Sequence, residues 1–164
     1  MSGCGLYTAP YKKVSAGTQQ QLRTQFGLLV HDETPMVRRQ AATHLAKFLK
    51  EMPAPVVVDE MIPMFQHLAQ DDQDSVRLLT VEVLISIAEV VPKEQQASHG
   101  VLLTSLRSLI EDKSWRVRYM VADRFEKVRF IMSCYFFEAV AYILRRSQKQ
   151  LMRRSCHGIW FPPS

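Results

Sequence analysis

The stretch from Glu111 to Phe125, EDKSWRVRYMVADRF, decides the fold because two earlier segments of the chain repeat its pattern. The segments DETPMVRRQAA (residues 32–42) and MIPMFQHLAQDDQDSVRLL (residues 61–79) share with it a Val-Arg dipeptide that follows an Asp by five residues. The dipeptides are Val37-Arg38, Val76-Arg77 and Val117-Arg118. They recur after 39 and then 41 residues, and a repeat of this length is typical of stacked helical pairs.

Apolar residues repeat together with the dipeptide. Upstream of it they are Leu22, Phe26 and Leu29, then Met61, Phe65 and Leu68, then Leu102, Leu106 and Leu109. Downstream they are Val37, Ala41, Leu45 and Phe48, then Val76, Thr80, Leu84 and Ile87, then Val117, Val121, Phe125 and Val128. Spacings of three and four residues predict helices with one buried face. We therefore predict an all-α fold, an α-α superhelix of about three helical hairpins, whose function is binding along a surface.

Turn-forming residues and the spacing of the repeats divide the chain into five parts. Residues 18–53, 54–93 and 94–128 are expected to form one repeat each. Residues 1–17, with three glycines, are expected to be the remnant of a preceding repeat or a linker. Residues 129–164 are expected to form a divergent tail that is apolar and then basic.

Polar residues stand where helices are expected to begin, and their side chains can accept hydrogen bonds from free backbone N–H groups. Thr18 is followed by Gln21 at the spacing of a capping box, and Thr34 precedes Pro35, which suits the first position of a helix. The predicted caps are Thr18, Thr34, Asp74 or Ser75, and Ser114.

The acidic residues of the repeats are expected to pair with the arginines. Asp32, Asp71 and Asp112 fall in the turn of each repeat, and Arg38, Arg77 and Arg118 follow six residues later. We predict that each Arg donates to the Asp of the next repeat, which gives a ladder of charge-assisted hydrogen bonds that fixes the stacking. The alternative is a set of solvated ion pairs, each contributing less than about 1 kcal/mol.

The charge balance argues against nucleic-acid binding by the repeats. Residues 1–128 contain 15 basic and 15 acidic residues, whereas residues 129–164 contain six basic residues and one acidic residue. The net charge of +5 therefore belongs to the tail, and no basic groove is implied along the repeats.

The tail opens with fifteen mostly apolar residues, 130–144. This is short of the roughly 20 residues that a membrane-spanning helix needs. Three alternatives are open: an apolar helix that covers the end of the stack, a disordered segment, or a helix that lies on acidic lipid next to its basic flank.

The sequence contains no recognisable catalytic motif. It lacks the His-Glu-x-x-His, Gly-x-Ser-x-Gly and Gly-rich phosphate-loop motifs. The five histidines are scattered, and the adjacent Cys156 and His157 do not have zinc-site spacing. We expect a protein that is not an enzyme and that holds no cofactor or metal.

Cysteine usage and the N-terminus bear on the compartment. The three cysteines, Cys4, Cys134 and Cys156, are odd in number and far apart, and no secretory signal precedes the repeats. We expect free thiols in a reducing compartment, the cytoplasm and also the nucleus.

The three quoted strings closely resemble HEAT repeats, in particular those of the scaffold subunit (A, or 65 kDa regulatory subunit) of protein phosphatase 2A. The resemblance covers residues 2 to about 128 and includes Pro63 in a first helix, with Thr24 and Thr104 at the matching positions. It implies an all-helical horseshoe that holds the catalytic subunit on its C-terminal repeats and B-type regulatory subunits nearer its N-terminal end. The matched repeats are internal ones of the N-terminal half, and the segment from Arg129 onward shows no such resemblance. The two Thr-containing helices are expected to kink less than the one with Pro63.

The resemblance also implies where a partner binds, because in that family the turns between paired helices line the ridge that partners touch. The residues that match these turns are Thr34, Pro35, Met36, Arg38, Arg39, Asp74, Ser75, Arg77, Lys113, Ser114, Trp115 and Arg116. Trp115 is the foremost candidate, since an indole between charged neighbours is typical of a binding hot spot. Alternatively its ring packs over its own repeat, and Arg39 and Arg116 pair locally with Glu33 or Asp112.

The function implied is that of a non-catalytic scaffold or regulatory module of protein phosphatase 2A that binds a B-type regulatory subunit. Direct binding of the catalytic subunit is not expected, because the repeats that hold it lie outside the resemblance. Two alternatives remain at this stage: a peripheral membrane or targeting protein that acts through residues 129–164, and a truncated fragment without function.

Overall fold

The structure, a computed structural model, describes residues 11–92 and 100–131. The chain divides into two units, Met1–Ile131 and Met132–Ser164, and every described residue belongs to the first. Within the described ranges the regular elements are all helical. The prediction of an all-α fold is confirmed.

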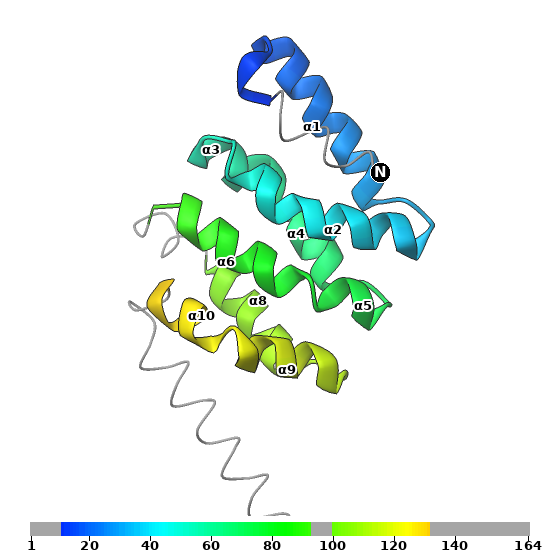
Figure 1. Cartoon of the computed structure of the whole chain (residues 1–164), viewed down its shortest axis with the longest axis vertical. Coiled ribbons are helices and arrows are strands. Elements are labelled where there is room, and N and C mark those ends of the chain that lie inside the picture. The colour runs from blue at the N-terminus through cyan, green and yellow to red at the C-terminus, as the bar shows by residue number, and fades with distance from the viewer. Residues whose placement is uncertain (1–10, 93–99, 132–164) are drawn as a thin grey trace, which may run out of the picture. The chain divides into compact units, whose positions relative to one another are not determined.

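The helices follow one another as three pairs (Figure 1). The first pair is α1 (Ala16–Val30) and α2 (Pro35–Leu49), preceded by the short 3₁₀ helix η2 (Tyr11–Lys13). The second pair is α3 (Ala54–Val56), η3 (Val57–Met61) and α4 (Ile62–Ala69), followed by α5 (Asp74–Arg77) and α6 (Thr80–Val90). The third pair is α8 (Val101–Ile110), followed by α9 (Trp115–Asp123) and α10 (Phe125–Ile131).

The pairs stack in two layers. The first helices form one layer, in which α1 contacts α4 and α4 contacts α8. The second helices form the other layer, in which α2 contacts α5 and α6, and α6 contacts α9 and α10. This is the architecture of a HEAT or armadillo-like repeat region, as the 39- and 41-residue spacing predicted.

The repeating apolar positions form the core, and the middle repeat buries them most completely. All seven of its positions, from Met61 to Ile87, are at most 2% exposed. In the first repeat Leu22, Leu29 and Val37 are only half-buried, and in the third Phe125 is. The difference arises because the middle repeat has a neighbour on both sides, whereas each outer repeat has one among the described residues.

The first helix of the second repeat contains a local irregularity. Its segment η3 is a π-helical turn in which the N–H of Ile62 donates to the carbonyl of Val57. Pro63 follows at once and has no N–H to donate to the carbonyl four residues earlier, so the regular α-helical ladder cannot run through this point. The matching helices α1 and α8 are each a single α-helix, in line with the smaller distortion expected where Thr24 and Thr104 replace the proline.

Three of the predicted helix caps need correction. Helix α1 begins earlier than expected, with Ser15 as its N-cap, and the Ser15 hydroxyl accepts from the N–H of Thr18. Thr34 occupies the N-cap position of α2 but makes no side-chain cap bond. Gln73, not Asp74 or Ser75, precedes α5. The bond predicted at Ser114 is present, accepted from the N–H of Arg116.

Tyr11, in the described part of the segment 1–17, packs against the first repeat. Tyr11 in η2 is 1% exposed and its ring meets that of Phe48 edge-on at 5.2 Å. The guanidinium of Arg23 donates to the Tyr11 hydroxyl at 2.8 Å and to Glu60 at 2.7 Å. The short turn before α1 therefore belongs to the core of the first repeat, which sequence periodicity could not show because Tyr11 lies outside the repeating positions.

We predict that Phe48→Ala destabilises the protein by about 3–5 kcal/mol, because it removes a fully buried ring and leaves a cavity. Phe48 is 0% exposed and lies 5.0 Å from Phe26, ring centre to ring centre. Chemical denaturation followed by circular dichroism measures the change. Leu28→Ala is the control, since Leu28 is 62% exposed and its truncation should change the free energy of unfolding by less than about 1 kcal/mol. Equal effects of the two substitutions would contradict this account of the core.

Candidate partner-binding surface

Three turns connect the paired helices, and an aspartate closes each one in the same way. One carboxylate oxygen of Asp32, Asp71 and Asp112 accepts from the N–H two residues later, at 2.7, 2.9 and 2.7 Å. We call these turns (residues 31–34, 70–73 and 111–114), together with the first residues of the helices that follow them, the turn ridge (Figure 1). The carboxylates hold the turns in one conformation before any partner arrives.

Each turn is also fastened to the helix that follows it by an arginine. The Nη1 of Arg38 donates to the carbonyls of Asp32 and Glu33 at 2.8 and 2.9 Å. Arg77 donates in the same way to the carbonyls of residues 71 and 72, at 2.6 and 2.9 Å. Arg118 donates to those of Asp112 and Lys113, at 2.7 and 3.2 Å. This use of the arginine within its own turn was not part of the sequence prediction.

Two of these arginines also join one repeat to the next. Arg38 donates from Nε and Nη2 to the two carboxylate oxygens of Asp71, at 2.5 and 3.1 Å. Arg77 donates in the same way, from Nε and Nη2, to the two carboxylate oxygens of Asp112, at 2.7 and 2.9 Å. The side chains of Asp71 and Asp112 are 3% and 8% exposed. These bidentate pairs are shielded from solvent, so they constrain the distance and orientation between two repeats more strongly than a surface ion pair does.

These contacts shift the pKa of the two buried carboxyls. Burial alone would raise the pKa of Asp71 and Asp112. The hydrogen bonds from Arg38 and the N–H of Gln73 outweigh it at Asp71, and those from Arg77 and the N–H of Ser114 outweigh it at Asp112. Both carboxyls therefore have a pKa below the ordinary value and are ionised at neutral pH.

The residues predicted to bind a partner differ in how much of their surface is available. Thr34, Pro35, Met36, Arg39, Lys113, Trp115 and Arg116 are exposed, and Arg38, Asp74, Ser75 and Ser114 are half-buried. Arg77 is only 4% exposed and its guanidinium is fully engaged by Asp112 and two carbonyls. Its burial leaves little surface for a partner to touch, and the predicted contact of Arg77 with a partner stays a prediction.

Trp115 is the first residue of α9 and its side chain is largely in solvent. It is 66% exposed, and Tyr119, one turn further along the helix, is 62% exposed. Their rings meet edge-to-face at 6.4 Å between centres. The two rings offer a large apolar area beside a turn whose backbone is fixed by Asp112 and Arg118. Neither Arg116 nor Arg39 forms an ion pair within the described residues.

A further contact joins the second and third turns. The hydroxyl of Ser114 donates to the carboxylate of Asp74 at 2.8 Å. Both residues were predicted to cap helices and to bind a partner, and the bond between them shows a third role in stacking. The sequence held no signal for it, because the pair does not recur: the matching residues one repeat earlier are Pro35 and Gln73.

A pocket of about 410 Å³ opens between the first two turns of the turn ridge. The imidazole rings of His31 and His67 stack in it, 4.2 Å apart between centres. Burial, and then the nearby His31, lower the pKa of His67. Carboxylates supply much of the remaining wall, among them the exposed Glu33 and Asp72.

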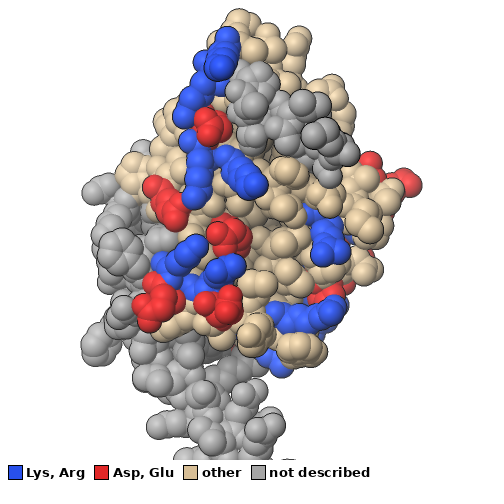
Figure 2. Space-filling view, viewed as in Figure 1, with Lys and Arg blue, Asp and Glu red and all other residues tan. Residues whose placement is uncertain are grey.

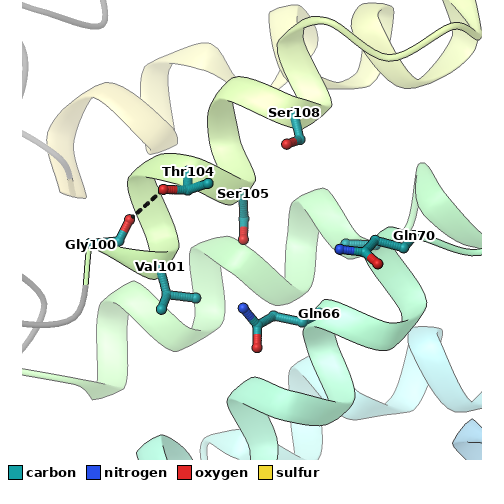
Figure 3. A pocket seen from close by; sticks show the side chains of 8 residues that line it. Gln66, Gln70, Gly100, Val101, Thr104, Ser105 and Ser108 are labelled. Carbon is teal, nitrogen blue, oxygen red and sulfur yellow. Dashed lines mark hydrogen bonds between the residues drawn. The ribbon is translucent and has the colours of Figure 1, made fainter.

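A second pocket, of about 270 Å³, lies in the layer of first helices, between α4 and α8 (Figure 3). Its polar lining is neutral and comes from Gln66, Gln70, Thr104, Ser105 and Ser108. The Thr104 hydroxyl is already committed to the carbonyl of Gly100 at 3.0 Å. None of the described residues that line this pocket has an ionisable side chain.

The charged side chains on the face drawn in Figure 2 alternate in sign and form no large area of one charge. Ion pairs also join neighbouring repeats, such as Lys50 with Glu89 at 2.7 Å and Arg124 with Glu82 at 3.5 Å. This mixture agrees with the equal numbers of acidic and basic residues in 1–128.

Two further expectations concern metal binding and the membrane. In residues 11–92 and 100–131 no group of three or more His, Cys, Asp or Glu is arranged to hold a metal ion. In the same part of the chain no helix has the length and apolar character to cross a membrane. Beyond Ile131 the apolar and basic tail lies outside the described residues, so its predicted membrane contact stays a prediction.

Stacked helical pairs with an ordered ridge of turns define a helical-repeat protein of the HEAT or armadillo-like class. Within that class, the chain belongs to the family described as "PIK3R4-like, middle domain", whose model matches residues 11–154. The match continues well past Val128, into the tail for which the sequence alone showed no resemblance.

The chain is also homologous to regulatory subunits of protein phosphatase 2A, as predicted from the three quoted strings. It is 47% identical over 128 residues to the A-type regulatory subunit of protein phosphatase PP2A from Schizosaccharomyces pombe, covering 77% of this chain and 22% of that protein. It is 33% identical over 133 residues to the protein of the same name from Saccharomyces cerevisiae, covering 76% of this chain and 21% of that one. A "Probable serine/threonine-protein phosphatase PP2A regulatory subunit" of Caenorhabditis elegans is 40% identical over 92 residues, 56% of this chain and 16% of that protein. The chain thus spans about a fifth of the length of the curated relatives it matches.

We predict that Arg77→Ala destabilises the protein by about 3–5 kcal/mol, because it leaves the buried carboxylate of Asp112 without its counter-charge. The matched substitution Arg118→Ala should have a much smaller effect, since Arg118 makes the same carbonyl bonds but pairs with no carboxylate in the described residues. Urea denaturation of both variants measures the difference. A double-mutant cycle with Asp112→Asn gives the coupling energy of the pair, and a coupling near zero would exclude Arg77 and Asp112 as a stabilising joint.

We also predict that acid weakens the stack through Asp112. Because its folded pKa lies below its unfolded value, the carboxylate stabilises the fold fully above the unfolded pKa, about 4, and loses this contribution as pH falls through the folded pKa. The melting temperature of the natural protein should therefore drop on acidification below about pH 4. Asp112→Asn should melt lower at neutral pH and lose less on acidification. Parallel pH profiles for the two proteins would contradict the assignment.

Proposed function

We propose that this chain is a non-catalytic scaffold module of protein phosphatase 2A and that it binds a B-type regulatory subunit through the turn ridge. The homology to proteins named as A-type regulatory subunits of that phosphatase supports the assignment to the phosphatase. The observation that carries the proposed binding surface is Trp115, 66% exposed on a turn that is already rigid.

Rigidity favours binding at this ridge. An exposed Trp on a mobile loop loses conformational freedom when a partner orders it, and this reduces the affinity. Here Asp112, Arg118 and Ser114 fix the backbone on which Trp115 stands, through hydrogen bonds of 2.7 to 3.3 Å. The indole can therefore enter a partner's pocket with little further ordering, as a hot-spot residue does.

The turn ridge also offers complementary charge. The pocket between the first two turns exposes Glu33 and Asp72, which favours a cationic side chain of the partner. The third turn exposes Lys113 and Arg116 on either side of Ser114 and Trp115, which favours an acidic neighbour for the indole. A partner would thus present a basic group towards the first repeats and an apolar pocket with an acidic rim towards the third.

We predict that the purified chain captures B-type regulatory subunits, whereas Trp115→Ala weakens this binding by about thirtyfold or more, the loss typical of a buried aromatic anchor. Biolayer interferometry with purified B-type subunits measures the affinity, and the catalytic subunit is tested in parallel. Lys47→Ala, an exposed residue in the last turn of α2 and away from the turn ridge, is the control and should bind normally.

The outcomes separate the proposal from its alternatives. Equal binding by the natural chain and by Trp115→Ala would exclude the third turn as the binding surface. A folded, helical chain that captures no B-type subunit would exclude the scaffold function itself. A chain without a cooperative unfolding transition would support the alternative of a fragment without function.

A further inference from the structure

Two histidines from different repeats stack against each other where the first repeat joins the second. His31 is the C-cap of α1, and His67 lies in the last turn of α4. The two rings are inclined by 28° and their centres are 4.2 Å apart. In the same pocket Arg38 of the first repeat pairs with Asp71 of the second. The first two repeats are therefore held together at their turns by an ion pair and by this stack, which we call the histidine pair.

The next joint has an equivalent ion pair but no histidine pair. His31 precedes the aspartate of its turn by one residue, and His67 precedes the aspartate of the following turn by four. The matching positions one repeat later are Gln70 and Ser108, which line the pocket between α4 and α8 (Figure 3). Neither side chain titrates, so proton uptake by the histidine pair has no counterpart at these positions of the next joint.

Charges of both signs surround the histidine pair. The described charged residues that line the pocket with it are Asp32, Glu33, Asp71, Asp72 and Arg38. Where α8 lines a pocket with α4, its described residues are uncharged. Acidic residues of η3 and α6, which also contact α4, form ion pairs with other helices: Glu60 with Arg23, Glu82 with Arg124 and Glu89 with Lys50. The charged groups that act on His67 are His31, Asp71 and Arg38.

The sign of the contact depends on protonation. Stacked neutral imidazoles attract each other, whereas two imidazolium ions at this distance repel. Partial burial and then the nearby His31 lower the pKa of His67, and with Arg38 they outweigh the opposite effect of Asp71. The folded protein thus takes up a proton at His67 less readily than the unfolded chain does. The contact therefore stabilises the fold fully above the unfolded pKa, about 6.5, and loses this contribution as the pH falls towards the lower folded pKa.

We propose that the histidine pair makes the contact between the first and second repeats sensitive to pH, so that acidification from about pH 7.5 to about pH 5.5 loosens the packing of α1 on α4. The packing of α4 on α8 does not respond in this way. The repeats do not separate, because the pKa of Asp71 lies below the ordinary value and its ion pair with Arg38 persists over this range. Since His31 and His67 are exposed, solvent screens the repulsion and the effect is moderate.

The chain itself supplies the substitutions that test this proposal. His31→Gln and His67→Ser give the first joint the residues that occupy the matching positions of the next one. Ser and His have similar helix propensities, so His67→Ser removes the ring without weakening α4 itself. His44→Gln is the control, because His44 is a half-buried histidine of α2 outside the pair. Each substitution is made in the full-length chain.

Thermal melting followed by circular dichroism measures the effect at the two pH values. On acidification the natural chain and His44→Gln should lose about 2 °C or more beyond the loss of His67→Ser. A double-mutant cycle with His31→Gln separates the stack from the bond that His31 Nδ1 makes with the carbonyl of Gly27. The coupling between His31 and His67 should be favourable at the higher pH and unfavourable at the lower one.

Hydrogen exchange shows where the natural chain loosens. After correction for the intrinsic exchange rates, amides in the last turn of α1 should lose protection by about threefold or more at the lower pH, relative to those in the last turn of α8. His67→Ser should not show this difference between the two helices. The natural chain alone gives this result, so a variant that fails to fold does not leave the proposal untested.

Three results would overturn the proposal. Parallel pH profiles of the natural chain and His67→Ser would mean that the ring of His67 does not confer the sensitivity. A coupling of the same sign at both pH values would mean that protonation does not turn the stack from attraction to repulsion. Equal changes of protection in α1 and α8 would mean that acid acts on the whole stack and not on its first joint.

Discussion

The stacking of this protein depends on a guanidinium that is shared between two repeats. One edge of Arg77 is bound to carbonyls of its own turn, and the other edge is bound to the carboxylate of Asp112. Because the guanidinium is planar and both of its edges are occupied, it fixes both the conformation of its own turn and the rotation between its repeat and the next. Arg38 does the same one repeat earlier. Burial of apolar surface is the dominant favourable contribution to folding, but it is non-directional and lets packed helices slide past each other. The paired charges require one geometry and therefore prevent such sliding.

The arrangement separates two tasks along each turn. The side chains of the Asp and the Arg form bonds within the stack. Residues close to them in sequence, such as Met36 and Trp115, expose their apolar side chains to solvent. A surface built in this way can vary its exposed residues without disturbing the stack. That property suits a scaffold, because the exposed residues of the turns recognise partners and the buried residues of the turns set the shape of the stack.

Sequence reasoning could predict the helical pairs and the pairing of Asp with Arg across repeats, because both recur at a fixed spacing and repetition is visible without coordinates. It could not predict features that occur once. Tyr11 packs on Phe48 from outside the repeat, and the bond of Ser114 to Asp74 has no counterpart between the first two turns, where the matching residues are Pro35 and Gln73. It also could not predict the burial of Arg77, since a charged residue near a turn suggests exposure and only the packed structure shows that stacking has buried it.

The joints between repeats also determine how the chain can fold. Arg38 and Asp71 are 33 residues apart in sequence, and Arg77 and Asp112 are 35 apart. Each joint therefore closes a loop of about one repeat, and none requires distant ends of the chain to meet, so the loss of chain entropy is divided into similar small steps. The middle repeat, which buries its core positions most completely, can form with either neighbour first. Folding of such a chain can spread in both directions from one nucleus instead of waiting for a single long-range contact.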